Sequence, residues 1–172
     1  MQKSIIGNWE IEFDKEATQK AYAQMSTAKY DCGCLSCRNF NEAAPLFPAP
    51  VVDFFTNLGA DVIKPAEVYD CGEFTEDHLL YYGLYHIVGN YLSGVDVWQP
   101  VAKKRLFRRR LQKDYQHYVA NTETMHAITS GFEIGFTENL SMLADGFPTP
   151  ALQMEIKFCV PWILDEPFNQ NF

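Results

Sequence analysis

A strictly alternating run near the C-terminus constrains the fold more than any other segment of the chain. Every second position from 152 to 160 is apolar, namely Leu152, Met154, Ile156, Phe158 and Val160. The positions between them carry Gln153, Glu155, Lys157 and Cys159. Successive side chains of a β-strand point to opposite faces of its sheet, so this period of two predicts a strand with one apolar face.

Other segments also have the composition of strands. Between residues 8 and 14, three large apolar residues alternate with acidic ones, which predicts a half-buried strand. After residue 65 the chain is rich in β-branched and aromatic residues, which are typical of sheets. We expect these further strands within residues 68–69, 79–92, 95–97, 115–119 and 125–136.

Apolar residues recur at helical spacing in two segments of the first third. One follows Asp14, a residue type that caps helix N-termini, and predicts a helix over about 15–28. The other lies between Val51 and Leu58, and Gly59 follows it as a helix-ending residue. This order of elements predicts an α+β fold, a mostly antiparallel sheet with helices from the N-terminal third packed on one face.

The size and composition fit one folded unit. The chain has 172 residues, of which 47% are hydrophobic and 15% aromatic. A chain of this length buries roughly two-thirds of the surface that its unfolded form exposes. We therefore expect a single domain over residues 1–172.

Basic residues are concentrated in one stretch of an acidic chain. The net charge is −8, and seven of the 14 basic residues lie within residues 103–113. The acidic remainder repels phosphates, so we expect no nucleic acid and no membrane as partner, and a protein as the expected kind of partner. The basic stretch either meets an acidic partner surface or forms an edge strand whose charges discourage sheet-to-sheet pairing.

The cysteines and the N-terminus indicate a reducing compartment. The first residues lack the apolar segment and cleavage site of a secretory signal, and no run reaches the ~20 apolar residues of a membrane span. Five cysteines are an odd number, and three of them lie within six residues, which does not suit a disulfide framework. We expect a cytoplasmic protein.

The three clustered cysteines are the most specific chemical signal in the chain. Cys32, Cys34 and Cys37 form a C-x-C-x-x-C pattern in which Gly33 gives the loop freedom to bring the sulfurs together. Thiolates bind zinc strongly, and a tetrahedral site needs one more ligand. We expect Cys71, in a loop-like segment beside Gly72, to be the fourth ligand, with His78 as its substitute.

The same residues allow two other interpretations. Cys34 and Cys37 form a C-x-x-C that could exchange disulfides, if a following helix and Arg38 lower the pKa of a thiol. Asp31 opposes this, and no strand of a βαβ unit precedes the motif. The remaining interpretation is three inert, reduced cysteines in a tight loop.

Other polar residues fit structural roles better than catalytic ones. We expect Cys159 and the strand histidine His86 to be packing residues, and the tyrosines around Tyr82 to belong to the core rather than to a ligand groove. Glu133 and Glu155 could meet across the sheet, but carboxylates on exposed strand faces are usually solvated. No established catalytic motif is present.

Three segments together resemble small uncharacterised bacterial proteins. They are D-C-x-C-x-x-C-R-N-F at 31–40, K-P-A-E-V-Y at 64–69 and F-x-V-P-W-I-L at 158–164. The resemblance implies no activity. From the residues we expect a small metal-binding domain with structural zinc, or a protein-interaction domain, rather than an enzyme. The alternatives are a thiol-disulfide oxidoreductase using Cys34 and Cys37, and a hydrolase, which would need a cleft with a base.

Overall fold

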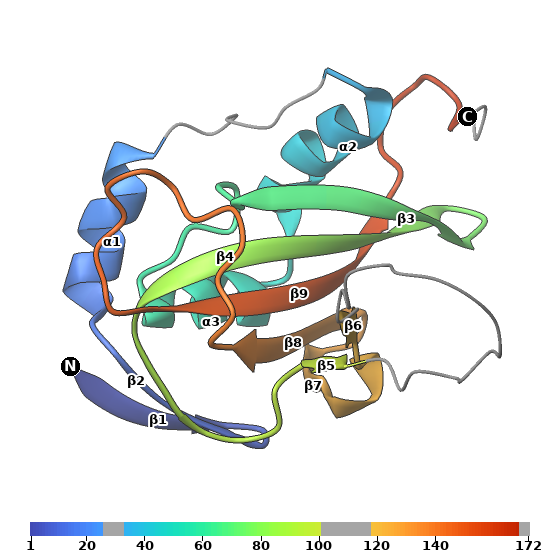
Figure 1. Cartoon of the computed structure of the whole chain (residues 1–172). Coiled ribbons are helices and arrows are strands. Elements are labelled where there is room, and N and C mark those ends of the chain that lie inside the picture. Colours follow the sequence, from blue (N-terminus) through green and yellow to red (C-terminus); the bar gives the residue numbers. More distant parts are fainter. Residues whose placement is uncertain (26–32, 101–117, 169–172) are drawn as a thin grey trace, which may run out of the picture.

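The computed structural model describes residues 1–25, 33–100 and 118–168 (Figure 1). Cys32 and the basic stretch 103–113 lie outside these ranges. The described helices are α1 (Lys15–Gln24), α2 (Leu35–Ala43) and α3 (Ala49–Leu58), with short 3-10 turns η1 (Ala44–Leu46) and η2 (Thr122–Thr124). The strands are β1 (Gln2–Ile6), β2 (Trp9–Phe13), β3 (Glu67–Thr75), β4 (His78–Ser93), β5 (Trp98–Pro100), β6 (Tyr118–Ala120), β7 (His126–Thr129), β8 (Phe132–Thr137) and β9 (Ala151–Pro161).

Seven strands form one antiparallel sheet around the long strand β4. One edge of β4 pairs with β9, and its other edge pairs first with β3 and then with β2. The order continues to β1 on one side, and through β8 to β7 on the other. β5 and β6 form a separate two-stranded sheet. A mostly antiparallel sheet with three described helices confirms the α+β class.

The pairing of β4 with β9 defines two faces of the sheet. Tyr81 lies opposite Phe158 and Tyr82 lies opposite Lys157, so alternate positions share a face. The core face carries the buried residues Tyr81, Tyr85, Ile87, Leu152, Met154, Ile156 and Phe158. The polar face carries Tyr82, Leu84, His86, Gln153, Glu155 and Lys157. The alternation predicted for residues 152–160 is confirmed.

Aromatic rings from α2 and α3 pack on the core face. The ring centroid of Phe40, in α2, lies 5.6 Å from that of Tyr81 and 5.5 Å from that of Phe158. The ring of Phe55, in α3, lies 4.7 Å from the ring of Tyr85. Offset and edge-on contacts of this kind stabilise a core beyond the area that they bury.

Helix α1 occupies a gap in the edge of β4. Between the ends of β3 and β2, the backbone N–H groups of His86 and Val88 have no strand partner on that edge. The Tyr22 hydroxyl accepts from His86 N at 3.2 Å, and Thr18 Oγ1 accepts from Val88 N at 3.1 Å. Two side chains of α1 therefore replace a neighbouring strand, and Figure 1 shows this helix beside the end of β4.

The local predictions differ from the structure in a few elements. The helix expected over 15–28 ends at Gln24, and residues 26–28 lie outside the described residues. The helix before Gly59 is confirmed as α3, with Gly59 left-handed at φ 83°. Neither β1 nor α2 was predicted as a defined element, and the segment around Cys71 is part of β3 rather than a loop. No described helix is both long and apolar enough to cross a membrane.

Candidate functional site

Cys34 and Cys37 meet at the first turn of α2. Cys34 is the N-cap residue of the helix, with an extended backbone, and its Sγ accepts a hydrogen bond from Cys37 N at 3.5 Å. Cys34 is an exposed free thiol, and Cys37 is half-buried. The structure thus brings two of the predicted ligands together on one helix end.

Contacts with the core fix the position of this helix end. The buried side chain of Asn39 donates to Pro161 O at 3.0 Å and accepts from Ile163 N at 2.8 Å. The Tyr81 hydroxyl donates to Ser36 O at 2.9 Å. Asn39 and Ser36 both belong to the N-terminal half of α2, so the end of the helix that carries the two cysteines is attached to the sheet near the end of β9.

Arg38 is engaged away from the thiols. Its guanidinium donates to Glu166 Oε1 at 2.9 Å, at the surface. The hydrogen bond raises the pKa of Arg38 and lowers the pKa of Glu166. The ion pair with Glu166 therefore weakens the effect that Arg38 was expected to have in lowering a thiol pKa.

The remaining predicted ligands are not assembled with this pair in the described residues. Cys71 is an exposed free thiol on β3, the strand beside α2, and burial, followed by the charge of Asp70, raises its pKa. His78 Nδ1 lies 3.3 Å from Thr75 Oγ1. Cys32 lies outside the described residues. Within residues 1–25, 33–100 and 118–168, no group of three or more His, Cys, Asp or Glu side chains could hold a metal ion.

A second polar cluster lies on the polar face of the sheet, centred on Glu155. Glu155 is fully buried, at 0% exposure. Its Oε1 accepts from Trp98 Nε1 at 2.6 Å and from Gln153 Nε2 at 2.5 Å. Burial raises the pKa of this carboxyl, and the hydrogen bonds from Trp98, Gln153 and Tyr82 act in the opposite direction.

The orientation of Gln153 follows from its partners. Its amide nitrogen donates to Glu155, so its Oε1 is the atom that accepts from Ser141 N at 2.6 Å. The same Oε1 lies 3.2 Å from His86 Nε2 and can accept a hydrogen bond in the tautomer that has its proton on that nitrogen. Burial lowers the pKa of His86, so this ring is neutral at physiological pH.

Two buried polar atoms of this cluster have no hydrogen-bond partner other than each other within the described part of the chain. They are Tyr82 Oη and Glu155 Oε2. The two residues are diagonal neighbours on β4 and β9. Burial, the charge of Glu155 and a side-chain hydrogen bond with Glu155 all raise the pKa of Tyr82, so these two groups contact each other.

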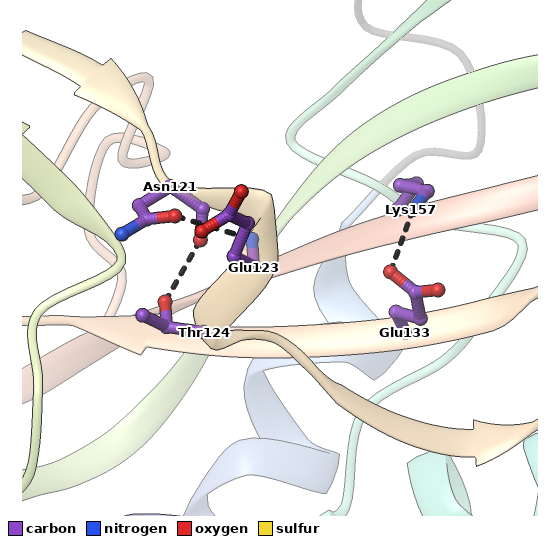
Figure 2. Close-up of polar contacts among 5 residues, drawn as sticks. All are labelled: Asn121, Glu123, Thr124, Glu133 and Lys157. Carbon is purple, nitrogen blue, oxygen red and sulfur yellow. Dashed lines mark hydrogen bonds and ion pairs between the residues drawn. The ribbon is translucent and has the colours of Figure 1, made fainter.

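The cation nearest to them in the strand register is already paired. Lys157 lies opposite Tyr82, and its Nζ donates to Glu133 Oε2 at 2.6 Å. Figure 2 shows this ion pair, together with the cap of η2 in which Asn121 accepts from Glu123 N. Lys157 therefore compensates Glu133 and leaves Glu155 without a described cationic partner.

A hollow of about 510 Å³ lies at the ends of β4, β8 and β9. Cys159, His78, Lys157 and Glu133 are among its lining residues. Burial raises the pKa of Cys159, which keeps this thiol protonated and unreactive. Since Glu133 is held by Lys157, the hollow offers no free carboxylate base among these residues.

Sequence reasoning missed the cluster around Glu155. Glu155 was expected to be solvated because it lies on the polar face of its strand, and this was wrong. The residues that cover it come from a distant segment: Trp98 lies 57 positions away. No local signal reports such a cover, whereas the alternation in β9 does identify the face.

Comparison of the chain with protein-family models, with curated protein sequences and with solved structures gave no match.

Proposed function

We propose that Cys34 and Cys37 form the core of a metal-binding centre, with zinc as the expected ion and Cys32 and Cys71 as the further ligands. The hydrogen bond from Cys37 N to Cys34 Sγ carries this proposal, because it places two cysteines on one helix end. Backbone N–H groups at a helix N-terminus stabilise negative charge, and cysteine binds zinc as the thiolate.

The role of the ion in this proposal is structural. Cys71 lies on β3, and α2 packs beside that strand. A metal ion shared between Cys71 and the start of α2 would link these two elements, and its binding free energy would add to the stability of the fold. The free thiols of Cys34, Cys71 and Cys159 suit a reducing compartment, so we propose a cytoplasmic location and a protein as partner.

Thiol–disulfide exchange is the second candidate. The exposure of Cys34 and its contact with Cys37 N favour it, because a disulfide substrate can reach this sulfur. In that reaction the Cys34 thiolate attacks a substrate disulfide, and Cys37 then displaces the mixed disulfide. The chain gains a Cys34–Cys37 disulfide, and the substrate leaves as two thiols.

We also infer that the helices of the N-terminal third cover the core face of the sheet. The rings of Phe40 and Phe55, which pack against Phe158 and Tyr85, support this arrangement for α2 and α3. The polar face would then be covered by the segment that contains Trp98 rather than by helices.

Elemental analysis tests the metal centre directly. The full chain is purified under reducing conditions without chelator, as wild type, Cys34→Ser and Cys159→Ser. We expect about one zinc ion per chain in the wild type and in Cys159→Ser, and none in Cys34→Ser. The thermal midpoint of Cys34→Ser should fall by several degrees, because the binding energy of the ion is lost.

The same samples separate the two candidates. A wild type that carries no metal, resists chelator without loss of stability and reacts readily with a thiol reagent at Cys34 would contradict the zinc proposal. Formation of a Cys34–Cys37 disulfide with a model disulfide substrate would then support exchange, and its absence would leave inert thiols.

A further inference from the structure

We propose that the hollow at the ends of β4, β8 and β9 is the docking site for a protein partner, which contributes a large apolar side chain flanked by lysine or arginine. The volume of the hollow, about 510 Å³, is in the usual range for binding pockets. This inference deepens the proposal of a protein partner, on which it rests. It does not involve the cysteines of the proposed metal centre.

Buried aromatic rings form part of the wall of the hollow. Phe47, which follows η1, and Phe132, in β8, are both buried, and their ring centroids lie 5.1 Å apart. Leu80 and Cys159, which lie opposite each other on β4 and β9, are further lining residues. An apolar side chain that enters the hollow would therefore leave water for aromatic and aliphatic surroundings, which favours binding.

Two large apolar residues at the rim of the hollow are exposed to solvent. Leu46 in η1 is 73% exposed, and Phe74 in β3 is 57% exposed. An exposed apolar surface with a polar border is typical of a protein interaction site. A polypeptide segment that crosses the hollow can contact both side chains, which is why the proposal names a protein rather than a small molecule.

The rim is also acidic on the side of β3. Glu76 and Asp77 are exposed and form the turn that joins β3 to β4. Asp77 O accepts from Trp162 N at 2.8 Å, which holds this turn beside the end of β9. Lining residues of the hollow stand on both sides of the turn, namely Phe74 and His78. The two carboxylates therefore lie close to the mouth of the hollow.

No described lysine or arginine is paired with these carboxylates. The chain has no basic residue of either type between residues 65 and 102, and the described ion pairs include neither Glu76 nor Asp77. Lys157 lines the hollow, but its ammonium group is paired with Glu133, so these two charges compensate each other. The rim therefore attracts a positively charged segment and repels phosphate groups and anionic lipid headgroups.

Saturation-transfer NMR on the full chain tests the site with a peptide probe, the acetylated and amidated hexapeptide Lys-Lys-Phe-Leu-Lys-Lys. We expect saturable binding that weakens as the salt concentration rises from about 0.05 M to about 0.5 M, because salt screens exposed charges. Two control peptides carry glutamate in place of the lysines, or serine in place of phenylalanine and leucine. Each should bind about tenfold more weakly or less.

Substitutions of the apolar rim test where the peptide binds. Leu46→Ser combined with Phe74→Ser removes two exposed side chains, so the fold should be retained while peptide binding falls about fivefold or more. Ile5→Ser combined with Leu140→Ser makes the same kind of change at exposed residues that do not line the hollow, and binding should be unchanged. Circular dichroism checks that both variants are folded.

The charge of the rim is tested by a second pair of variants. Glu76→Gln combined with Asp77→Asn should weaken binding about threefold and reduce its dependence on salt, because two exposed carboxylates are removed. Glu16→Gln combined with Asp145→Asn changes the net charge equally at exposed residues that do not line the hollow, and it should leave binding unchanged.

Several results would overturn the proposal. They are the absence of saturable binding, equal binding of the probe and the serine peptide, and equal loss of binding in the rim variants and their controls. Binding only after replacement of Arg108, Arg109 and Arg110 by glutamate would identify residues 103–113 of the chain itself as the occupant, and it would also overturn the proposal of a partner protein. Zinc content is a separate readout, so none of these results affects the proposed metal centre.

Discussion

Glu155 is a titratable group whose burial favours its neutral form. The groups that face it are Trp98, Gln153 and Tyr82, whose hydrogen bonds lower its pKa, and Asp96, whose negative charge raises the pKa. Burial is the largest cause of the rise from the ordinary value. The native state therefore keeps a proton on this carboxyl at pH values where the unfolded chain has released it.

This difference gives stability a definite dependence on pH. Between the unfolded and the raised native pKa of Glu155, the native state binds more protons than the unfolded state, so the free energy of unfolding falls as pH rises. Glu155→Gln removes this contribution. The free energy of unfolding of the variant should therefore lack this decline, so its difference from wild type should shift in favour of the variant as pH rises. Urea unfolding from pH 5 to pH 8 measures this difference.

The neighbouring histidine acts in the opposite sense. The lowered pKa of His86 makes its contribution to stability increase with pH, and both proteins carry it. The difference between wild type and Glu155→Gln therefore isolates the carboxyl. A constant difference across the pH range would show that Glu155 has no raised pKa in the native protein.

The residue scale also shows where sequence reasoning stops. The alternation in 152–160 places Glu155 on the face opposite Phe158, as the structure does. Whether that face meets water depends on Trp98 and Ser141, which reach it from other parts of the chain. The alternation of residues along a strand shows to which face of the sheet each side chain points. Whether that face is buried depends on which other segments of the chain pack over it.

At the scale of elements, α1 completes the edge of β4 with side-chain hydroxyls. Thr18 is fully buried, accepts from Val88 N at 3.1 Å and donates to Asp14 O at 2.7 Å. Thr18→Val keeps the shape but removes the acceptor, and it leaves the N–H of Val88 buried without a partner. We expect a loss of about 1–3 kcal/mol in the free energy of unfolding, measured by urea denaturation.

Two variants serve as controls for this effect. Thr18→Ser keeps the hydroxyl and should retain more of the stability than Thr18→Val does, although it loses a buried methyl group. Thr56→Val makes the same chemical change at an exposed position of α3 and should have little effect. A Thr18→Val protein as stable as wild type would mean that Val88 N finds another acceptor.

The elements that were predicted and those that were missed differ in the interactions that stabilise them. β2, β9 and α3 each bury one regular apolar stripe, so their periods are visible in the sequence. β1 was missed because most of its residues are exposed, so no apolar period marks it. α2 contains serine, cysteine and two asparagines, which are weak helix formers, and it depends on the contacts of Asn39 and Phe40 with the sheet.

At the scale of the whole molecule, charge is the property that the sequence describes best. The acidic excess outside residues 103–113 and the compact basic stretch are both independent of the fold. The described charged residues form three ion pairs, Arg38 with Glu166, Lys64 with Asp61 and Lys157 with Glu133, and surface pairs of this kind add little to stability. The uneven distribution of charge should therefore affect partner binding more than the stability of the fold.

The basic stretch predicts that the chain binds a negatively charged surface, although its net charge is negative. Although the chain carries −8, seven clustered cations should retain it on a sulfonate resin at low ionic strength, with elution as salt screens the contact. Reversal of Arg108, Arg109 and Arg110 to glutamate lowers the net charge by six, and retention should fall clearly.

The matched control reverses Lys3, Lys15 and Lys20 to glutamate and so has the same net charge with an intact cluster. We expect this control to remain on the resin at salt concentrations that release the Arg variant. Equal loss of retention in both proteins would show that only the total charge matters, and the stretch would then be a solvated segment rather than a partner site.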